Sequence, residues 1–242
     1  MLVMAGCASQ TEQQVQLTPP KREFVALKDV PLTSSPLFGI YDPFEKFNRS
    51  MYNFNARFDR YVFLPVVHRY DAITPNIVQA GVHNFFNNLD EVYNLMNNLL
   101  QGELRDSGAT LGRFVINSTI GVLGLWDPAT KMGIYERKED FGQTLGRWGV
   151  GPGPYLVLPI FGPSTLRDTG GLLVDYAAES SFEHAVLEDS PSEDEVRLGM
   201  NTLEAIDERR HTSFRYYETG SPFEYTLVRY AYERMRRVQI EK

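Results

Sequence analysis

Residue types on which many functional sites depend are scarce in this sequence of 242 residues. Cys7 is the only cysteine, which excludes an internal disulfide and any zinc site built on paired cysteines. The histidines lie far apart, and none has a second histidine four residues on, as a helical zinc motif requires. They are His68, His83, His184 and His211. The sequence therefore predicts no metal site.

Long hydrophobic runs are absent too. The longest apolar stretches, residues 120–126 and 155–161, fall far short of the roughly 20 residues that a membrane-spanning helix needs. Lysine and arginine number 24 against 31 aspartates and glutamates, so the net charge is −7. This deficit of positive charge argues against nucleic acid as a partner. It does not decide whether the protein binds a membrane, because a local basic patch or apolar insertion would suffice.

Catalytic and cofactor motifs are missing as well. The nucleophile pattern G-x-S-x-G does not occur, and Ser164 has no histidine near it in the sequence. Gly149, Gly151 and Gly153 follow no predicted strand and precede no Gly-Lys-Ser/Thr, so they do not form a nucleotide loop. The sequence gives no positive indication of catalysis and predicts no cofactor.

The N-terminus reads M-L-V-M-A-G-C-A-S, in which small residues precede Cys7. This pattern is typical of a bacterial lipobox, whose cysteine is acylated and becomes the first residue of the mature chain. Residues 1–6 are then a truncated remnant of a signal that begins upstream; the alternative is an ordinary cysteine in a tail. Residues 7–40 contain several prolines and few periodic apolar positions, so they are predicted to form a flexible tether.

Helical periodicity begins at residue 41. Asp42 suits an N-cap and Pro43 the first helical position, and aromatic or apolar residues follow at three- and four-residue steps. These are Phe44, Phe47, Met51, Phe54 and Phe58. We expect this stripe to face the core, with contact to lipid or ligand as the alternative.

A second helix is predicted from Thr74 to about Gln101, where Gly102 can end it. One face is continuously apolar, and the other carries asparagines with few charges: Asn84, Asn87, Asn88, Asn94, Asn97 and Asn98. Asparagine is a weak helix former, so tertiary contacts must hold this helix. The amide face is expected to meet other helices, water or lipid headgroups; a plain solvated surface is the alternative.

The remaining chain is predicted to be helical apart from one unusual stretch. Residues 106–126 suit a helix that ends in a glycine-rich apolar segment, and helices are expected after Gly171, at 193–211 with Ser192 as cap, and at 222–240. The last ends in Arg234, Arg236 and Arg237, which favour a helix C-terminus or attract lipid phosphate or an acidic partner. Between them, residues 140–171 hold so many glycines and prolines that a shaped loop is expected.

Three blocks of sequence carry a family resemblance. D-P-F-E-K-F-N-R-S-M-Y-N-F-N, then F-G-Q-T-L-G-R-W-G-V-G-P-G-P-Y-L-V-L-P, then G-P-S-T-L-R-D-T-G-G together resemble the MlaA/VacJ outer-membrane lipoproteins over about residues 40–178. The resemblance implies an all-α, ring-like helical domain over residues 41–242 that lies in the membrane plane, with Gly/Pro-rich loops and no transmembrane helix.

The resemblance also implies a function and partners. Such proteins remove misplaced phospholipids from the outer leaflet of the outer membrane through an amphipathic channel and pass them to the periplasmic carrier MlaC, often while bound to trimeric porins. A lipid anchor on Cys7 at the periplasmic face is implied, and neither a cofactor nor a reaction is.

Within these blocks we assign candidate residues for the lipid path. Phe47 and Asn48 are candidates for packing of the helical ring beside the channel, and Arg167 with Asp168 for a polar pair that fixes the following turn. The irregular wall is expected to comprise Trp148, Gly149, Gly151, Gly153, Pro154, Tyr155 and Pro159. Two other functions stay open: a phospholipid-degrading enzyme, and a structural tether associated with porins.

Overall fold

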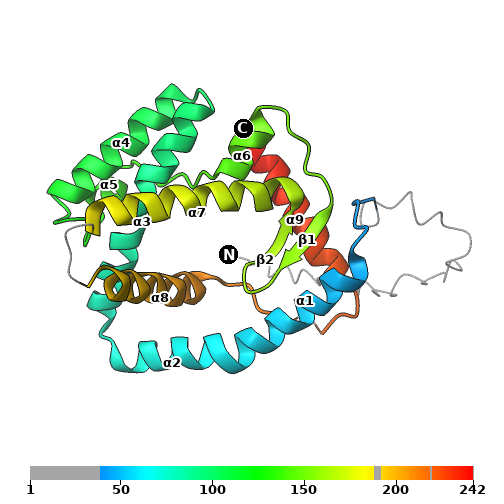
Figure 1. Ribbon diagram of the computed structural model, residues 1–242. Helices are drawn as coiled ribbons and strands as arrows, with labels where there is room; N and C mark the ends of the chain where they lie inside the picture. The colour runs from blue at the N-terminus through cyan, green and yellow to red at the C-terminus, as the bar shows by residue number, and fades with distance from the viewer. Residues whose placement is uncertain (1–38, 188–191, 219, 242) are drawn as a thin grey trace, which may run out of the picture.

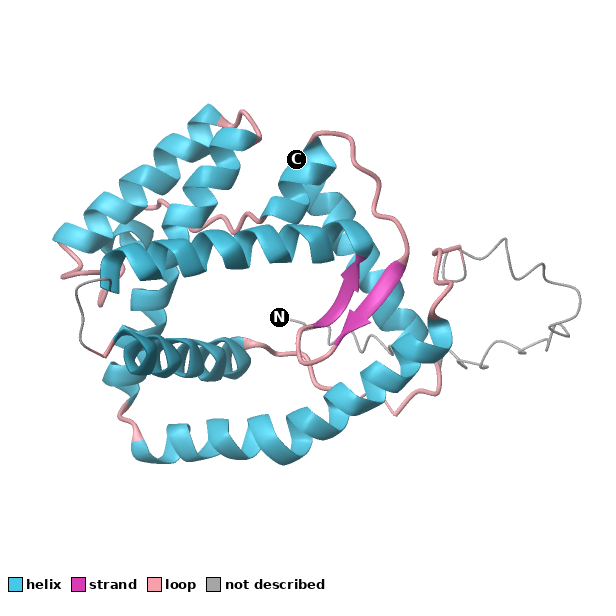
Figure 2. Ribbon diagram, viewed as in Figure 1, coloured by secondary structure: helices cyan, strands magenta, loops and turns pink. Residues whose placement is uncertain are grey.

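Helices make up most of the chain in the computed structural model, which describes residues 39–187, 192–218 and 220–241. In chain order the helices are α1 (Glu45–Phe58), the π-helix η2 (Asp59–Phe63), α2 (Leu64–Ile73), α3 (Asn76–Leu100), α4 (Leu104–Thr119), α5 (Pro128–Lys131), α6 (Phe141–Arg147), α7 (Leu166–Leu187), α8 (Glu193–His211) and α9 (Glu224–Ile240). The predicted all-α class is confirmed, with one small addition. Strands β1 (Tyr155–Leu158) and β2 (Gly162–Thr165) form an antiparallel hairpin in the Gly/Pro-rich stretch (Figure 2).

The ribbon follows the outline of a ring (Figure 1). α1, η2 and α2 run along one side, α3 turns away from the end of α2, and α7 passes opposite them toward the hairpin and α9. α8 packs against α2, α3 and α7, while α4 packs along α3. In the part of the chain that the structure describes, no helix combines the length and apolarity needed to cross a membrane.

The limits of α3 follow its sequence signals. Pro75 precedes the first turn, and the side chain of Gln79 donates a hydrogen bond to the carbonyl of Thr74 at 2.8 Å. At the other end Gly102 has a φ of +77°, a left-handed conformation that glycine adopts without steric cost. The predicted start and end of this helix are confirmed.

Two other predicted starts are wrong. Asp42 does not cap α1, which begins at Glu45, because its carboxylate accepts hydrogen bonds from Tyr225 and Arg229 of α9. The helix predicted after Gly171 begins earlier, at Leu166. An interior glycine is tolerated there because Gly171 lies against Gly142 of α6; a Cβ on Gly171 would come within 2.3 Å of the Gly142 nitrogen.

Most of the aromatic stripe of α1 faces outward, so the prediction that it faces the core is wrong except at Met51, which packs against the core cluster, and Phe58, which is half-buried. Phe44, Phe47 and Phe54 are 50%, 54% and 45% exposed, whereas Asn48 and Tyr52 are buried. Ser192 likewise makes no side-chain capping hydrogen bond, although α8 spans the residues expected of it. The direction of the α1 stripe is the larger error, because it inverts which face of the helix meets the solvent.

Amide side chains attach α1 to the hairpin. Asn48 donates to the carbonyl of Tyr155 at 2.9 Å and accepts from the nitrogen of Val157 at 2.9 Å. Asn55 likewise donates to the carbonyl of Leu158 and accepts from the nitrogen of Ile160, each at 2.8 Å. Seven helical residues rise about 10.5 Å and three strand residues about 10 Å, so the two asparagines match the repeat of β1. They take the place of a neighbouring strand.

The asparagine face of α3 is also directed inward. Asn94 accepts from the nitrogen of Glu139 at 2.8 Å, Asn97 accepts from Thr144 at 2.8 Å, and Asn88 donates to Ser118 at 3.0 Å. The expectation that tertiary contacts hold this face is confirmed, and a plain solvated surface is wrong. On the opposite face Ile77 and Leu99 are 75% and 54% exposed.

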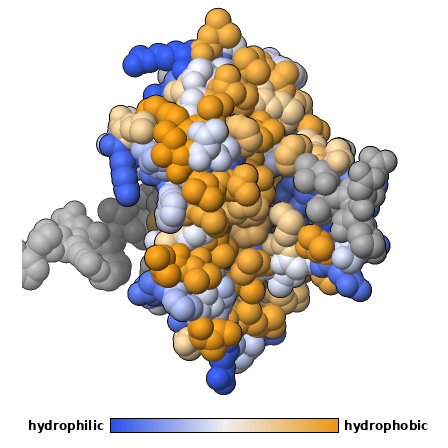
Figure 3. All heavy atoms as spheres, turned by 90° about the vertical axis from the view of Figure 1, so that its left-hand side faces the viewer, coloured by the Kyte–Doolittle hydropathy of each residue, from blue (hydrophilic) through white to orange (hydrophobic). Residues whose placement is uncertain are grey.

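Inside and outside are therefore exchanged relative to a water-soluble protein. The buried apolar residues include one cluster of Tyr52, Tyr155, Val157 and Tyr225, whereas most other buried side chains are polar or charged. Large apolar side chains lie on the surface of α1 to α4. Figure 3, which views the side of the molecule with α3 and α4, shows a band of hydrophobic residues between hydrophilic ones. Soluble proteins rarely expose apolar area on this scale unless it meets a partner or a membrane.

Candidate functional site

The Gly/Pro-rich stretch forms the hairpin and the loop that leads into it. Residues 148–154 connect α6 to β1, and the turn at 159–161 joins the two strands, with Tyr155 opposite Thr165 and Leu158 opposite Gly162. The nitrogen of Tyr155 also bonds the carbonyl of Tyr41 at 2.9 Å, so the strand is held from both sides. The shaped loop predicted here thus contains two short strands that sequence reasoning did not identify.

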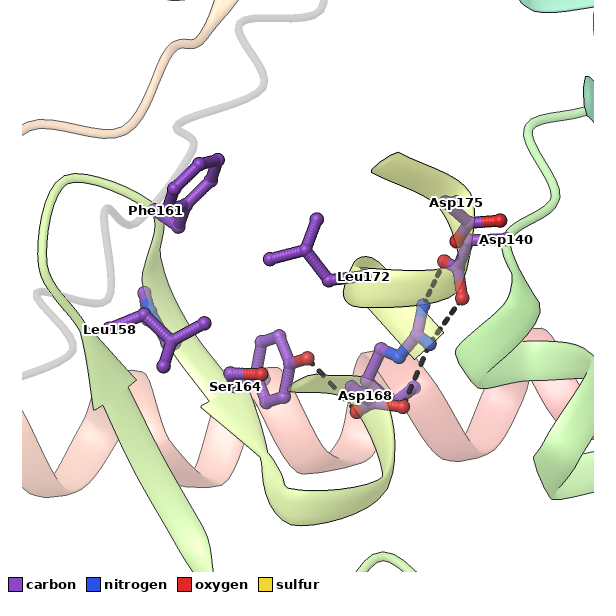
Figure 4. Close-up of a pocket in the computed structure, with 10 residues that line it drawn as sticks. Asp140, Leu158, Phe161, Ser164, Asp168, Leu172 and Asp175 are labelled. Carbon is purple, nitrogen blue, oxygen red and sulfur yellow. Dashed lines mark hydrogen bonds and ion pairs between the residues drawn. The ribbon is translucent and has the colours of Figure 1, made fainter. Parts of the chain in front are cut away.

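A cavity of about 200 Å³ lies between the hairpin, α6, α7 and α9. We call it the hairpin pocket. Leu158 and Phe161 of the hairpin form an apolar side, and the opposite side is mainly charged; Figure 4 shows Leu172 reaching from α7 between them. The charged and polar lining comprises Asp140, Ser164, Asp168, Asp175, Tyr232 and Arg236.

Arg236 organises the charged wall. Its guanidinium group donates to both carboxylate oxygens of Asp140, at 2.6 and 2.7 Å, and to Asp168 Oδ1 at 2.9 Å. Arg236 is only 7% exposed, and its pair with Asp168 lies out of water, whereas the Asp140 side chain is 40% exposed. Of the roles that the sequence left open for this arginine, lipid phosphate and an acidic partner outside the chain do not apply, because its charge is committed to two aspartates of the same chain. Arg237, in contrast, lies on the surface and pairs with Glu233 at 3.2 Å.

The arginine sets the charge state of both aspartates. Burial by itself would raise the pKa of Asp140, but the hydrogen bonds and positive charge of Arg236 outweigh it and hold the pKa below its usual value. The same balance, with Arg167 contributing, lowers the pKa of Asp168. Asp140 and Asp168 therefore stay ionised at neutral pH.

The first turn of α7 places Asp168. The Thr165 hydroxyl accepts from the nitrogen of Asp168 at 3.2 Å and donates to its Oδ2 at 2.9 Å, a reciprocal cap. Arg167 donates to Asp168 Oδ1 at 3.0 and 2.8 Å, and Tyr232 donates to Oδ2 at 3.0 Å. The structure thus brings the predicted pair Arg167 and Asp168 into contact beside the pocket.

The other residues assigned from the sequence are spread over the loop and α1. Asn48 and Tyr155 are buried, Pro154 is half-buried, and Phe47, Trp148, Gly149, Gly151, Gly153 and Pro159 are exposed. Trp148 is tethered nevertheless, because its indole nitrogen donates to the carbonyl of Leu100 at 3.0 Å. Cys7 lies outside the described residues.

Sequence reasoning missed Asp140 and Asp175. Asp140 caps α6 through the nitrogen of Gln143, at 2.8 Å, and Asp175 accepts from the nitrogen of Phe141 at 2.9 Å. An aspartate three residues before Gln143 is a readable helix-start signal for the first. No local pattern marks its pairing with Arg236, which is 96 residues away.

A second cavity, of about 210 Å³, lies between α3, α7 and α8. We call it the carboxylate pocket, because Asp90, Glu179 and Glu204 join its mainly apolar lining of Phe85, Phe86, Leu89, Tyr93, Phe182 and Met200; Glu183 completes it. Burial is the largest cause that raises the pKa of Asp90 to about 6, of Glu179 to about 7 and of Glu204 to about 8. Repulsion from neighbouring carboxylates adds to the rise: from Asp90 and Glu183 at both glutamates, and from Glu136 and Glu208 at Asp90, where Lys138 opposes it. Sequence reasoning did not find this pocket.

Both cavities suit a molecule with a polar and an apolar end. A headgroup left without polar partners, or a chain left in a polar slot, would carry a desolvation penalty, and each pocket offers both kinds of wall. As for nucleophiles, Ser164 bonds Thr169 at 3.0 Å and no histidine is among the described residues that line the hairpin pocket.

The same architecture and a similar sequence occur in known proteins. A solved structure described as "Structural basis for maintenance of bacterial outer membrane lipid asymmetry" matches with a TM-score of 0.64 and 30% identity, over 82% of this chain and 98% of that one. A protein of Rickettsia conorii is 33% identical over 84% of this chain and 79% of its own length.

Named relatives match over a shorter region. The intermembrane phospholipid transport system lipoprotein MlaA of Escherichia coli K12 is 39% identical over 57% of this chain and 56% of its own length. The protein of the same name from Haemophilus influenzae is 37% identical over 56% of each. In these alignments the chain spans just over half the length of its relatives. The sequence model of the MlaA lipoprotein family matches residues 40–239, and the chain belongs to that family.

Proposed function

We propose that this protein is an outer-membrane lipoprotein that removes mislocalised phospholipids from the outer leaflet and passes them to a periplasmic carrier. It lies in the periplasmic leaflet, anchored by an acyl chain on Cys7. The removal of these lipids maintains the asymmetry of the outer membrane. The names of the Escherichia coli relative and of the matching structure support this proposal.

The observation that carries the proposal is that apolar side chains lie on the surface while polar ones fill the interior. Exposed apolar side chains such as Phe54, Ile77 and Leu123 would be unfavourable in water, and ten half-exposed residues of this kind gain about 10 kcal/mol when they enter hydrocarbon. Because no described helix can span a membrane, the apolar band suits a ring embedded in one leaflet. Its polar interior then offers headgroups a path that the surrounding hydrocarbon does not.

The lipid path is proposed to pass the hairpin. The exposed loop at 148–154 forms its irregular wall, with the side chains of Trp148 and Pro154 and the open surface at Gly149, Gly151 and Gly153. Tyr155 and Pro159 continue the wall along the strand and turn. Asn48 supports it from α1, with Phe47 on the lipid side, and Arg167 and Asp168 hold the charged side of the adjacent pocket.

Two protein partners complete the proposal. The soluble carrier MlaC receives the lipid on the periplasmic side, and a trimeric porin holds the ring in place through part of the apolar band. Neither partner requires a cofactor or a chemical step in this chain.

Surface phospholipid tests the proposal in cells. Deleting the gene should raise phospholipid in the outer leaflet, measured with a reagent that reacts only with lipid on the cell surface, while porin levels stay normal. Restoring the intact gene should reverse the rise. No rise on deletion, with porins intact, would contradict lipid removal.

A second experiment separates this function from the two alternatives. Purified protein incubated with labelled phospholipid should retain the lipid chemically unchanged. Release of fatty acid that is lost on substitution of one serine or aspartate would instead favour an enzyme. Absence of co-purifying phospholipid, together with impaired porin assembly on deletion, would favour a structural tether.

A further inference from the structure

Two histidines that are distant in the sequence meet at the contact between α3 and α8. His83 of α3 and His211 of α8 stack with ring centroids 3.6 Å apart and an angle of 21° between the rings. Sequence spacing hid this pair, because neither histidine has a partner four residues away. His211 does have Asp207 at that spacing, on the same face of α8.

Asp207 lies against both rings. Its Oδ2 is 2.7 Å from His83 Nδ1 and 3.4 Å from His211 Nδ1, so one donor atom of each side chain lies within 4.8 Å of the others. Zinc held at bond lengths of about 2.0–2.2 Å requires ligand atoms a little over 3 Å apart, with each imidazole nitrogen pointing at the ion in the plane of its ring. The two rings must therefore turn out of their stacked arrangement to bind one ion.

The carboxylate is left incompletely compensated. Asp207 is 3% exposed, and among the described residues its Oδ1 has no hydrogen-bond partner. A buried carboxylate with an unpaired oxygen is costly, and a cation beside it would remove that cost. The imidazole side chains of His83 and His211 are 31% and 37% exposed, so solvent can reach the remaining coordination position.

Neighbouring side chains can orient the rings. The amide of Asn87 lies 3.0 Å from His83 Nε2; with the amide turned, its oxygen accepts the Nε2 proton and leaves Nδ1 free for a metal. Nδ1 of His211 lies 2.9 Å from the backbone carbonyl of Asp207, a hydrogen bond that metal binding must replace. Arg210 lies 3.3 Å from His211 Nε2, but its charge is shared with Asp71 at 2.7 Å. The chain thus supplies the metal ligands themselves and, in Asn87, a side chain that orients one of them.

From this geometry we propose that His83, Asp207 and His211 form a binding site for a divalent transition metal, of which zinc fits best. Two imidazoles and one carboxylate leave one tetrahedral position for water. The ion clamps α8 to α3 and thereby fixes one side of the ring. This site is independent of the proposed lipid function.

Zinc binding by the untagged, full-length protein in detergent tests the site. After removal of metal with a chelator, calorimetric titration should show one zinc ion per chain. Free zinc at about 100 times its Kd should raise Tm by about 5–10 °C. Hydrogen exchange at the C-terminal end of α8 should slow when zinc is added.

Matched variants locate the binding. His211→Ala and His83→Ala should weaken zinc binding at least tenfold, since even the loss of an outer partner costs that much, and Asn87→Ala should weaken it about 10–100-fold without removing a ligand. His68→Ala, on α2, is the control and should bind zinc normally.

Absence of saturable binding by the wild-type protein would overturn the proposal, as would equal affinity in the His211→Ala and His68→Ala variants. If the ligand variants unfold, nitrogen NMR of the wild-type histidine rings decides instead. Zinc should shift the Nδ1 signals of His83 and His211, and unchanged signals would contradict the site.

Discussion

The hairpin pocket and the carboxylate pocket use the same acidic residue types with opposite consequences. In the hairpin pocket Arg236 lies between Asp140 and Asp168 and lowers the pKa of both, whereas burial raises the pKa of Asp175 in the same lining. In the carboxylate pocket Glu179 and Glu204 face each other and Asp90 without such a cation in its described lining, and the pKa of each is raised. Burial acts in the same direction in both, so the neighbouring charge decides the outcome.

Removing the cation from the hairpin pocket should have the largest effect. Arg236→Ala removes the main ionic partner of the buried Asp168, which keeps Arg167, and of Asp140, whose side chain is 40% exposed. It should lower the free energy of unfolding by about 3 kcal/mol. Chemical denaturation in detergent measures the change. Arg237→Ala, which breaks only a surface pair with Glu233, should change it by less than about 0.5 kcal/mol. Equal effects of the two substitutions would mean that the buried network contributes little.

The strand that lines the hairpin pocket depends on amides of α1. Asn48→Ala leaves the Tyr155 carbonyl and the Val157 nitrogen without their bonds, and we expect a loss of about 2–3 kcal/mol. Phe47→Ala, one residue away on the exposed face, should leave stability in detergent nearly unchanged and weaken membrane association instead. A larger destabilisation by Phe47→Ala would show that the face of α1 has been assigned wrongly.

The carboxylate pocket should make stability fall as pH rises. An unfolded carboxyl group has a pKa of about 4, so between pH 4 and 8 the folded protein binds more protons at Asp90, Glu179 and Glu204 than the unfolded chain does. The stabilisation present below pH 4 is thus lost as pH rises through about 6 to 8. Glu204→Gln should raise Tm at pH 8 and change it little at pH 5.

Glu195→Gln is the matched control for that substitution, because Glu195 is exposed on the same helix. It should leave the pH profile of Tm unchanged. If Glu204→Gln behaves the same way, the raised pKa values do not contribute to stability. In the hairpin pocket the sign is reversed: the contribution of Asp140 and Asp168 is present above pH 4 and lost as acid titrates them.

The smallest expected effect on stability belongs to the loop beside the hairpin pocket. No atom lies within 4 Å of a Cβ added to Gly151, and its φ is not positive, so Gly151→Val should change stability by less than about 0.5 kcal/mol. If the loop shapes the lipid path, the same variant should still raise surface phospholipid in cells. Gly149→Val, at a φ of +88°, should cost about 1–3 kcal/mol. A large fall in Tm for Gly151→Val would mark the position as structural.

Helix positions were readable from the sequence because their signals are local. Pro75 and Gly102 bound α3, and α8 spans the residues that periodicity predicted. Periodicity also identified which residues share a face of α1. It could not tell which face points inward, because a hydrophobic stripe turns toward whatever is least polar, and in a lipid leaflet that is the outside.

The candidate site was only partly readable. Arg167 and Asp168 are adjacent in the chain, so their pairing could be proposed locally. Arg236 and Asp140 are 96 residues apart, and His83 and Asp207 are 124 apart. Such pairs arise from packing of distant helices, and a single sequence carries no signal of them.

The most direct test of the account is whether the apolar band lies in lipid or in water. Cys7→Ser removes both the proposed anchor and the only cysteine, so one cysteine introduced at Phe54, Ile77 or Leu123 can carry a spin label in phospholipid bilayers. We predict that these labels are relaxed by oxygen dissolved in the lipid and shielded from a water-soluble nickel complex, while the unanchored protein stays bound to the bilayer. Strong relaxation by the nickel complex at all three positions, with the protein free in solution, would contradict a ring embedded in the leaflet.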